Sequence, residues 1–118
     1  MEIVASVGTD KENWGQILAL LNRAEYEKAI IVKNRNAESF PVNDRCIVIE
    51  IDSSLSLVNL KSYLLEKLKK ELSGDFEVNL SIASGTGKEH MALVSALLSV
   101  PVGIRLVAYT KEGIEFLT

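Results

Sequence analysis

Residues 84–88 read Ser-Gly-Thr-Gly-Lys, a small polar turn that ends in a cation. Backbone N–H groups at the start of a helix lack internal partners and lie at the positive end of the helix dipole, so a turn of this kind can hold a phosphate. Lys88 adds a mobile positive charge at the same place. The alternative is that Ser84 or Thr86 caps the following helix while the glycines only form a tight turn. The residues alone leave both interpretations open.

The same segment differs from the Walker A loop of ATPases, G-x-x-x-x-G-K-[ST], at two of its fixed positions. Ile82 stands where the first glycine belongs, and Glu89 stands where the Mg²⁺-binding hydroxyl belongs. A carboxylate at that position would repel the triphosphate. The sequence therefore argues against an ATPase or a GTPase.

A second polar turn, Gly8-Thr9-Asp10, follows the first apolar run of the chain. Thr9 and Glu12 fit a capping box, which predicts that a helix begins here. Asp10 is suited to bind a ribose hydroxyl or to cap the same helix. His90 lies one turn into a predicted helix, where the neutral imidazole is favoured, so it is either a general base or a partly buried surface histidine.

Composition limits the kind of partner. The chain has 118 residues, a net charge of −3 and 47% hydrophobic residues, which predicts one folded domain over 1–118. The acidic balance argues against direct binding of duplex nucleic acid but allows a small anionic ligand. Cys46 is the single cysteine, and no Cys/His spacing predicts a metal site or a cofactor. With no signal-like segment and no apolar run of membrane-spanning length, we expect a soluble cytoplasmic protein without membrane contact.

Hydrophobic periodicity predicts alternating elements. The predicted strands span residues 2–7, 28–33, 46–51, 76–83, 103–110 and 114–117. The predicted helices span 9–24, 56–72 and 88–99, and Ser73-Gly74-Asp75 is the stop signal after the second. Strand runs that are apolar on consecutive residues are typical of sheets covered on both faces. We therefore expect a Rossmann-like three-layer α/β sandwich with a mainly parallel sheet and a C-terminal β-hairpin. Residues 34–45 contain no evident helix, so the relative direction of strands 28–33 and 46–51 stays open.

In such a sheet, ligands bind outside the carboxyl ends of the strands, where the strand order reverses. The turns at 8–11 and 84–88 are expected to face each other there, and Asp52-Ser53-Ser54 either lines the same place or leads into a helix. The helix over 88–99 is apolar nearly all round, which predicts burial on more than one side. A second copy of the chain is the simplest cover, so we expect a homodimer with two copies of the 84–88 turn around one axis.

These features resemble the CRISPR-associated Rossmann fold (CARF) domain family. Ser-Gly-Thr-Gly-Lys-Glu-His-Met-Ala-Leu-Val-Ser-Ala-Leu-Leu, residues 84–98, is similar to the second motif of the family, in which a polar glycine turn ends in a cation and continues into an apolar helix. The resemblance implies ligand contacts from two loops: Ser6, Gly8 and Thr9 match the first, and Ser84, Gly85, Thr86, Gly87 and Lys88 match the second. Asp10 joins these ligand-binding candidates through its own position in the first turn.

The resemblance further implies a homodimeric sensor of cyclic oligoadenylates, the second messengers of type III CRISPR antiviral defence. One alternative is a metal-independent ring nuclease, in which Lys88 stabilises charge, Ser6 or Thr9 positions the sugar and His90 acts as a base. A second alternative is a Rossmann-like dimerisation module without a ligand, in which the glycines only shape turns.

Overall fold

The computed structural model describes every residue of the chain except 73, so the predicted helix end at Ser73 lies outside the described residues. The elements are β1 (Glu2–Val7), a 3₁₀ turn η1 (Lys11–Asn13), α1 (Trp14–Arg23), β2 (Lys28–Asn34), β3 (Cys46–Ile51), α2 (Leu57–Glu71), β4 (Glu77–Ser81), α3 (Gly87–Ser99), β5 (Gly103–Thr110) and β6 (Gly113–Phe116). Every predicted strand and helix is present, with ends shifted by a few residues.

The strands form one sheet in the order β3-β2-β1-β4-β5-β6. All neighbouring pairs are parallel except β5 and β6, which pair antiparallel across Lys111 and Glu112. The chain therefore starts in the middle of the sheet, extends to one edge, returns and builds the other side. The order reverses between β1 and β4, so the loops after these two strands begin side by side.

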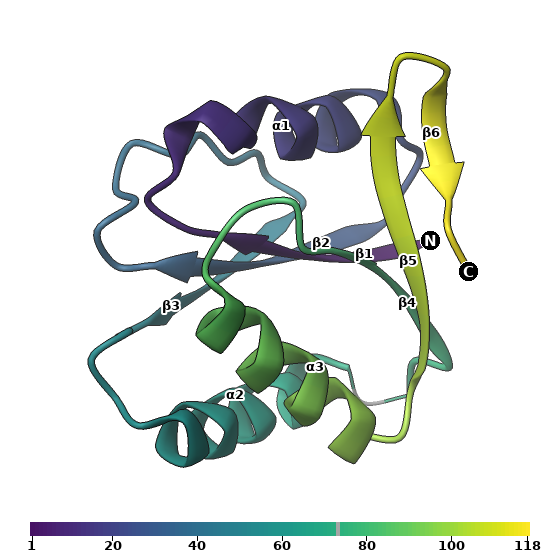
Figure 1. Cartoon of the computed structure of the whole chain (residues 1–118). Coiled ribbons are helices and arrows are strands. Elements are labelled where there is room, and N and C mark those ends of the chain that lie inside the picture. The colour runs from purple at the N-terminus through teal and green to yellow at the C-terminus, as the bar shows by residue number, and fades with distance from the viewer. Residues whose placement is uncertain (73) are drawn as a thin grey trace.

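Helices cover both faces of the sheet (Figure 1). On one face α1 packs its buried side chains Trp14, Ile17 and Leu21 against β1 and β2. On the other face α2 contributes Leu60, Leu64 and Leu68, spaced four residues apart along one stripe. The buried side of α3 carries Ala92, Leu93, Ala96 and Leu97. These two apolar clusters hold the carboxyl ends of β1 and β4 in fixed positions.

The connection between β2 and β3 resolves a point that the sequence left open. The two strands are parallel, in register from Ala29↔Cys46 to Asn34↔Ile51. Residues 35–45, which form this connection and are all described by the structure, contain no helix. Ala37 and Phe40 of this connection are buried in the apolar cluster on the α1 face of the sheet. The rings of Phe40 and Trp14 pack edge to face, with 5.3 Å between their centroids. Across the same described residues, no helix has the length and apolar character needed to span a membrane.

Candidate functional site

The loops that follow β1 and β4 contact each other directly. The N–H of Gly8 donates to Ser84 Oγ at 2.9 Å, and that hydroxyl donates to Asp10 Oδ1 at 2.6 Å. The N–H of Gly85 donates to the same carboxylate oxygen at 3.0 Å. The structure therefore brings together two of the predicted turns, from positions more than seventy residues apart in the chain.

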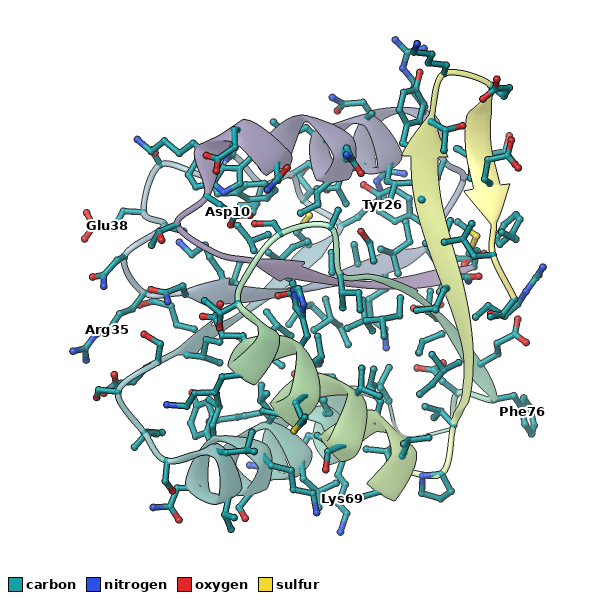
Figure 2. The ribbon with its side chains drawn as sticks, viewed as in Figure 1. Asp10, Tyr26, Arg35, Glu38, Lys69 and Phe76 are labelled. Carbon is teal, nitrogen blue, oxygen red and sulfur yellow. The ribbon has the colours of Figure 1, made fainter. Side chains whose placement is uncertain are left out.

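The capping box predicted at Thr9 and Glu12 is wrong. The chain forms a 3₁₀ turn at Lys11–Asn13 and α1 begins only at Trp14. Asp10 lies beside this end of α1 (Figure 2), and its carboxylate bonds to the second loop instead of capping a helix. The Trp14 indole N–H donates to the carbonyl of Gly8 at 2.9 Å, which holds the first loop from the other side. Thr9 is exposed.

Two of the three glycines in these loops are required by this contact. A Cβ at Gly8 would lie 2.6 Å from the Cα of Gly85, which no real side chain tolerates. Gly85 has φ +107° and a Cβ there would lie 2.7 Å from Ser6 Oγ, so it is excluded by conformation and by space. Gly87 is different, because a Cβ there would meet no atom within 4 Å. Its missing side chain leaves the start of α3 open to solvent.

Two N–H groups at the start of α3 are hydrogen-bonded by side chains of the same turn. Thr86 is the N-cap: its hydroxyl accepts from the N–H of Glu89 at 3.2 Å, and Glu89 Oε1 accepts from the N–H of Thr86 at 2.8 Å. Glu89 is only 2% exposed, and its second oxygen accepts from the Asn34 amide at 2.9 Å. Sequence reasoning missed Asn34, although a polar residue at the carboxyl end of a central strand was a usable signal.

Other N–H groups at this helix start remain available. In the described chain, 1–72 and 74–118, the N–H groups of Gly87 and Lys88 have no protein acceptor. Lys88 is exposed, and its Nζ donates to the carbonyl of Ser53 at 2.8 Å, which leaves further ammonium donors. Lys88 thus joins the α3 start to the loop after β3.

The loop after β3 is ordered around Asp52. The Ser54 hydroxyl and N–H donate to Asp52 Oδ1 at 2.7 and 2.9 Å, and Arg35 lies 3.4 Å from Oδ2. The hydrogen bonds from Ser54, together with the charges of Arg35 and Lys88, hold the pKa of Asp52 below its ordinary value. Three loops therefore meet at this edge of the sheet, with Lys88 at their junction.

The two remaining candidate residues, Ser6 and His90, both lie close to Gly85. Ser6 is 2% exposed and lies beneath the second loop. His90 Nε2 is 2.7 Å from the carbonyl oxygen of Ser84. Because a carbonyl only accepts, Nε2 carries the hydrogen, and in the neutral ring Nδ1 is left as the acceptor. His90 is thus positioned at the surface of the loop, whereas Ser6 is covered by it.

The outer side of α3 carries an uncharged, mostly apolar stripe of residues at helical spacing, which we call the α3 stripe. It consists of Gly87, His90, Met91, Val94, Ser95 and Leu98. Met91 and Leu98 are 61% and 67% exposed. The stripe borders an open groove of about 430 Å³ and contains no residue with a permanent charge. It begins at Gly87, so the groove is continuous with the open start of the helix.

Asp10 makes the loop contact dependent on pH. Partial burial raises the pKa of this carboxyl, but the hydrogen bonds from Ser84, Asn13 and the N–H of Gly85 outweigh it and hold the pKa below the ordinary value of 3.8. A group with a lowered folded pKa stabilises the fold above its unfolded pKa, and this contribution is lost as the pH falls below 3.8 towards the folded value.

Urea unfolding measured from pH 5 down to about pH 2.5 checks this dependence. We expect the stability of the wild type to fall more steeply below pH 3.8 than that of Asp10→Asn, which keeps hydrogen-bond acceptors but does not titrate. Asp44→Asn, which removes an exposed carboxylate that has no hydrogen-bond or ion-pair partner in the described residues, serves as the control. Parallel curves for wild type and Asp10→Asn would show that the Asp10 carboxylate contributes nothing through its charge.

A scan against protein-family models finds no match for this chain, and a search of the curated proteins finds none either. Its function must therefore be inferred from its own residues.

Proposed function

We propose that the chain is a Rossmann-like domain of the CARF type that binds a cyclic oligoadenylate across the two-fold axis of a homodimer. One observation carries this proposal: the open start of α3 and the apolar stripe of α3 are parts of one continuous surface, because Gly87 belongs to both and His90 of the stripe lies one turn further along. A ligand site and a dimer face that share residues are expected when the ligand spans two subunits.

The phosphate contacts are assigned to the start of α3. The N–H groups of Gly85 and Thr86 are used within the protein, so an anion would take those of Gly87 and Lys88. These lie at the positive end of a helix of 13 residues, where a phosphate is stabilised by both the N–H donors and the dipole. Lys88 supplies charge, and the exposed hydroxyl of Thr9 is within the neighbouring loop. Asp10 is assigned to loop positioning rather than to the ligand.

The dimer face is assigned to the α3 stripe. Large apolar side chains at 61% and 67% exposure are stabilised by burial, and a full Met or Leu side chain contributes about 1.5–3 kcal/mol. An uncharged stripe can pack against itself about a two-fold axis without like-charge repulsion. With the axis beside the first turn of α3, both Lys88 side chains and both open helix starts lie on one side of the dimer. A ring with several phosphates matches that symmetry.

Binding, rather than cleavage, is the activity that the geometry favours. A ring nuclease needs groups that touch the ribose and the scissile phosphate. Ser6 is 2% exposed beneath the second loop, which does not favour it in that role. If no ring binds, the remaining alternative is a dimerisation module without a ligand.

Calorimetric titration with cyclic tetra- and hexa-adenylate in EDTA tests the proposal. Lys88→Ala is expected to weaken binding by about 10- to 100-fold, because a charged hydrogen bond contributes about 1.5–3 kcal/mol. Lys69→Ala, a substitution on the solvent-facing side of α2, is the charge-matched control and is expected to bind like wild type (Figure 2). Equal affinities for the two variants would remove Lys88 from the site. Linear products on chromatography would favour the ring nuclease.

A further inference from the structure

β3 forms an open edge of the sheet. Within the described residues its outer side pairs with no other strand. The N–H of Ala29 donates to the carbonyl of Arg45, and the N–H of Arg35 donates to the carbonyl of Ile51. In β3, odd-numbered residues therefore direct their backbone groups towards β2, and even-numbered residues direct theirs outwards. No proline or bulge interrupts the strand, so the devices that usually block a sheet edge are missing from its backbone.

Four backbone groups on this outer side are free. The N–H and the carbonyl of Val48, the carbonyl of Cys46 and the N–H of Glu50 have no hydrogen-bond partner in the part of the chain that the structure describes. The next group at each end is occupied: the N–H of Cys46 donates to the carbonyl of Asn43 at 3.1 Å, and the carbonyl of Glu50 accepts from the Tyr63 hydroxyl at 3.0 Å. The open edge is thus a slot of defined length, closed at both ends.

The four free groups match a strand that runs parallel to β3. A parallel neighbour places one residue between the Cys46 carbonyl and the Val48 N–H, and the second following residue between the Val48 carbonyl and the Glu50 N–H. Three residues of such a strand therefore make four hydrogen bonds. An antiparallel neighbour makes only two, both with Val48, before its next residue faces the occupied carbonyl of Glu50 or the occupied N–H of Cys46. The occupied ends favour the parallel direction.

A groove of about 260 Å³ lies beside the slot, between β3 and α2. It is lined on the strand side by residues 47–50 and on the helix side by Tyr63, Lys67, Lys70 and Glu71. Residues in register on parallel strands share a face of the sheet, and Ile47 and Ile49 lie on the α2 face. The two bonded residues of an added strand would be in register with these isoleucines, so their side chains enter the groove. The residue between them lies beside Val48, which is 41% exposed.

The helix wall of the groove carries two lysines without an acidic partner. Neither Lys67 nor Lys70 forms an ion pair within the described residues. Tyr63 marks one end of the groove by its bond to Glu50, and along α2 the residues Lys67, Lys70 and Glu71 follow towards the other end. An acidic side chain in register with Ile47 would therefore meet both ammonium groups. An apolar side chain two residues later would meet the Tyr63 ring.

A second copy of the chain does not suit the slot. Two copies of β3 related by a two-fold axis pair antiparallel. Centred on Val48, this pairing sets residue 50 of one copy opposite residue 46 of the other, so the Tyr63 hydroxyl and the Asn43 carbonyl compete for the same space between the strands. The two Lys67 side chains would also lie on one face near the axis, where their like charges repel.

We propose that the β3 edge binds an extended peptide segment of a partner protein, which adds to the sheet as a strand parallel to β3. Its acidic residue faces Lys67 and Lys70, and its apolar residue two positions later faces Tyr63. In recognition by strand addition, backbone hydrogen bonds supply affinity and side-chain pockets supply specificity. The slot shares no residue with the α3 stripe or with the turns at 8–10 and 84–88, so this inference does not depend on the proposed function.

Titration of the ¹⁵N-labelled protein with the peptide acetyl-Ser-Glu-Val-Leu-Ser-amide tests the proposal by amide chemical shifts. We expect saturable shifts at the N–H groups of Val48 and Glu50, which gain acceptors, with a Kd on the order of 0.1–1 mM for a ligand of this size. The same peptide with lysine in place of glutamate is expected to bind at least about tenfold more weakly. No shifts at Val48 and Glu50, or equal affinities for the two peptides, would overturn the proposal.

N-methylation of the peptide tests the direction of the added strand. In the parallel arrangement the N–H groups of its glutamate and leucine face β3, so methylation at either is expected to weaken binding at least about tenfold. The N–H of its valine faces away, so methylation there is the matched control and is expected to leave the affinity unchanged. In an antiparallel strand with the same side chains in the groove, only the valine N–H faces β3. Loss of binding on methylation of valine alone would therefore overturn the parallel assignment.

Two substitutions in the protein locate the site. Val48→Pro removes one N–H of the slot at an edge position that tolerates proline, and is expected to abolish the shifts at Glu50, whereas Val48→Ala keeps the N–H and retains them. Lys67→Glu is expected to weaken binding at least about tenfold, with Lys69→Glu on the solvent-facing side of α2 as the matched control. If Val48→Pro does not fold, the N-methylated peptides on the wild type decide. Concentration-dependent shifts at Val48 without peptide would assign the edge to a second copy and overturn the proposal.

Discussion

Replacing Gly85 with alanine is expected to lower the free energy of unfolding by about 3 kcal/mol, through a left-handed backbone and an overpacked contact. The residue has φ +107°, and a Cβ would lie 2.7 Å from Ser6 Oγ and 3.1 Å from both Glu89 Oε1 and His90 Nε2. None of these groups can retreat easily. Ser6 is buried, Glu89 caps α3, and His90 is bonded to the carbonyl of Ser84. Urea unfolding monitored by circular dichroism measures the change.

Gly87→Ala is the matched control, two positions along the same turn and directly after the helix cap Thr86. A Cβ at Gly87 meets nothing within 4 Å and its φ is not positive, so alanine is accommodated. Since alanine favours helix over glycine by up to about 1 kcal/mol, the variant is expected to be as stable as wild type or slightly more stable. If the two substitutions destabilise the protein equally, the close approach of the loops is not what requires glycine at Gly85.

Met91→Glu is expected to break the proposed dimer and with it the proposed ligand binding. The Met91 side chain is 61% exposed in the single chain and lies in the middle of the α3 stripe. Two carboxylates facing each other at a two-fold axis, and the loss of two buried Met side chains, are expected to weaken association by more than about 100-fold, or about 3 kcal/mol. Sedimentation velocity across a concentration series measures the association, and urea unfolding verifies that the monomer remains folded.

Phe76→Glu provides the control for adding a charge to an exposed apolar position. Phe76 is 92% exposed at the start of β4, and Figure 2 shows it projecting from the molecule away from α3. Its substitution is expected to leave the sedimentation profile unchanged. If Phe76→Glu dissociates the dimer and Met91→Glu does not, the two-fold face lies elsewhere and the α3 stripe is wrongly assigned.

Most of the fold could be predicted from the sequence because each element carries its own local pattern. The consecutive apolar residues of β2 and the four-residue leucine spacing of α2 each depend on a short segment. The direction of β3 relative to β2 could not be predicted in this way. The segment that connects the two strands packs Phe40 against Trp14, a contact between distant parts of the chain that no local periodicity encodes.

The candidate site was predicted in position but not in its internal contacts. Two turns after strands of one parallel sheet must lie at the same edge, so the proximity of the loops follows from the fold class. The role of Asp10 does not follow, because its partners Ser84 and Gly85 are more than seventy residues away in the chain. Gly8 and Gly85 allow the two loops to approach each other closely. Packing does not require glycine at position 87, because a Cβ there would meet no atom within 4 Å.

The stoichiometry of cyclic tetra-adenylate binding tests the central claim most directly. A ring held on the two-fold axis of a homodimer requires one ring for every two chains, whatever the affinity. Calorimetry in EDTA, with the mass of the complex measured by light scattering, gives this number. The proposed sensor predicts 0.5 ring per chain in a particle of two chains. One ring per chain would contradict the two-fold site, and no heat with an unchanged monomer would contradict the sensor and leave residues 84–88 as the start of a helix.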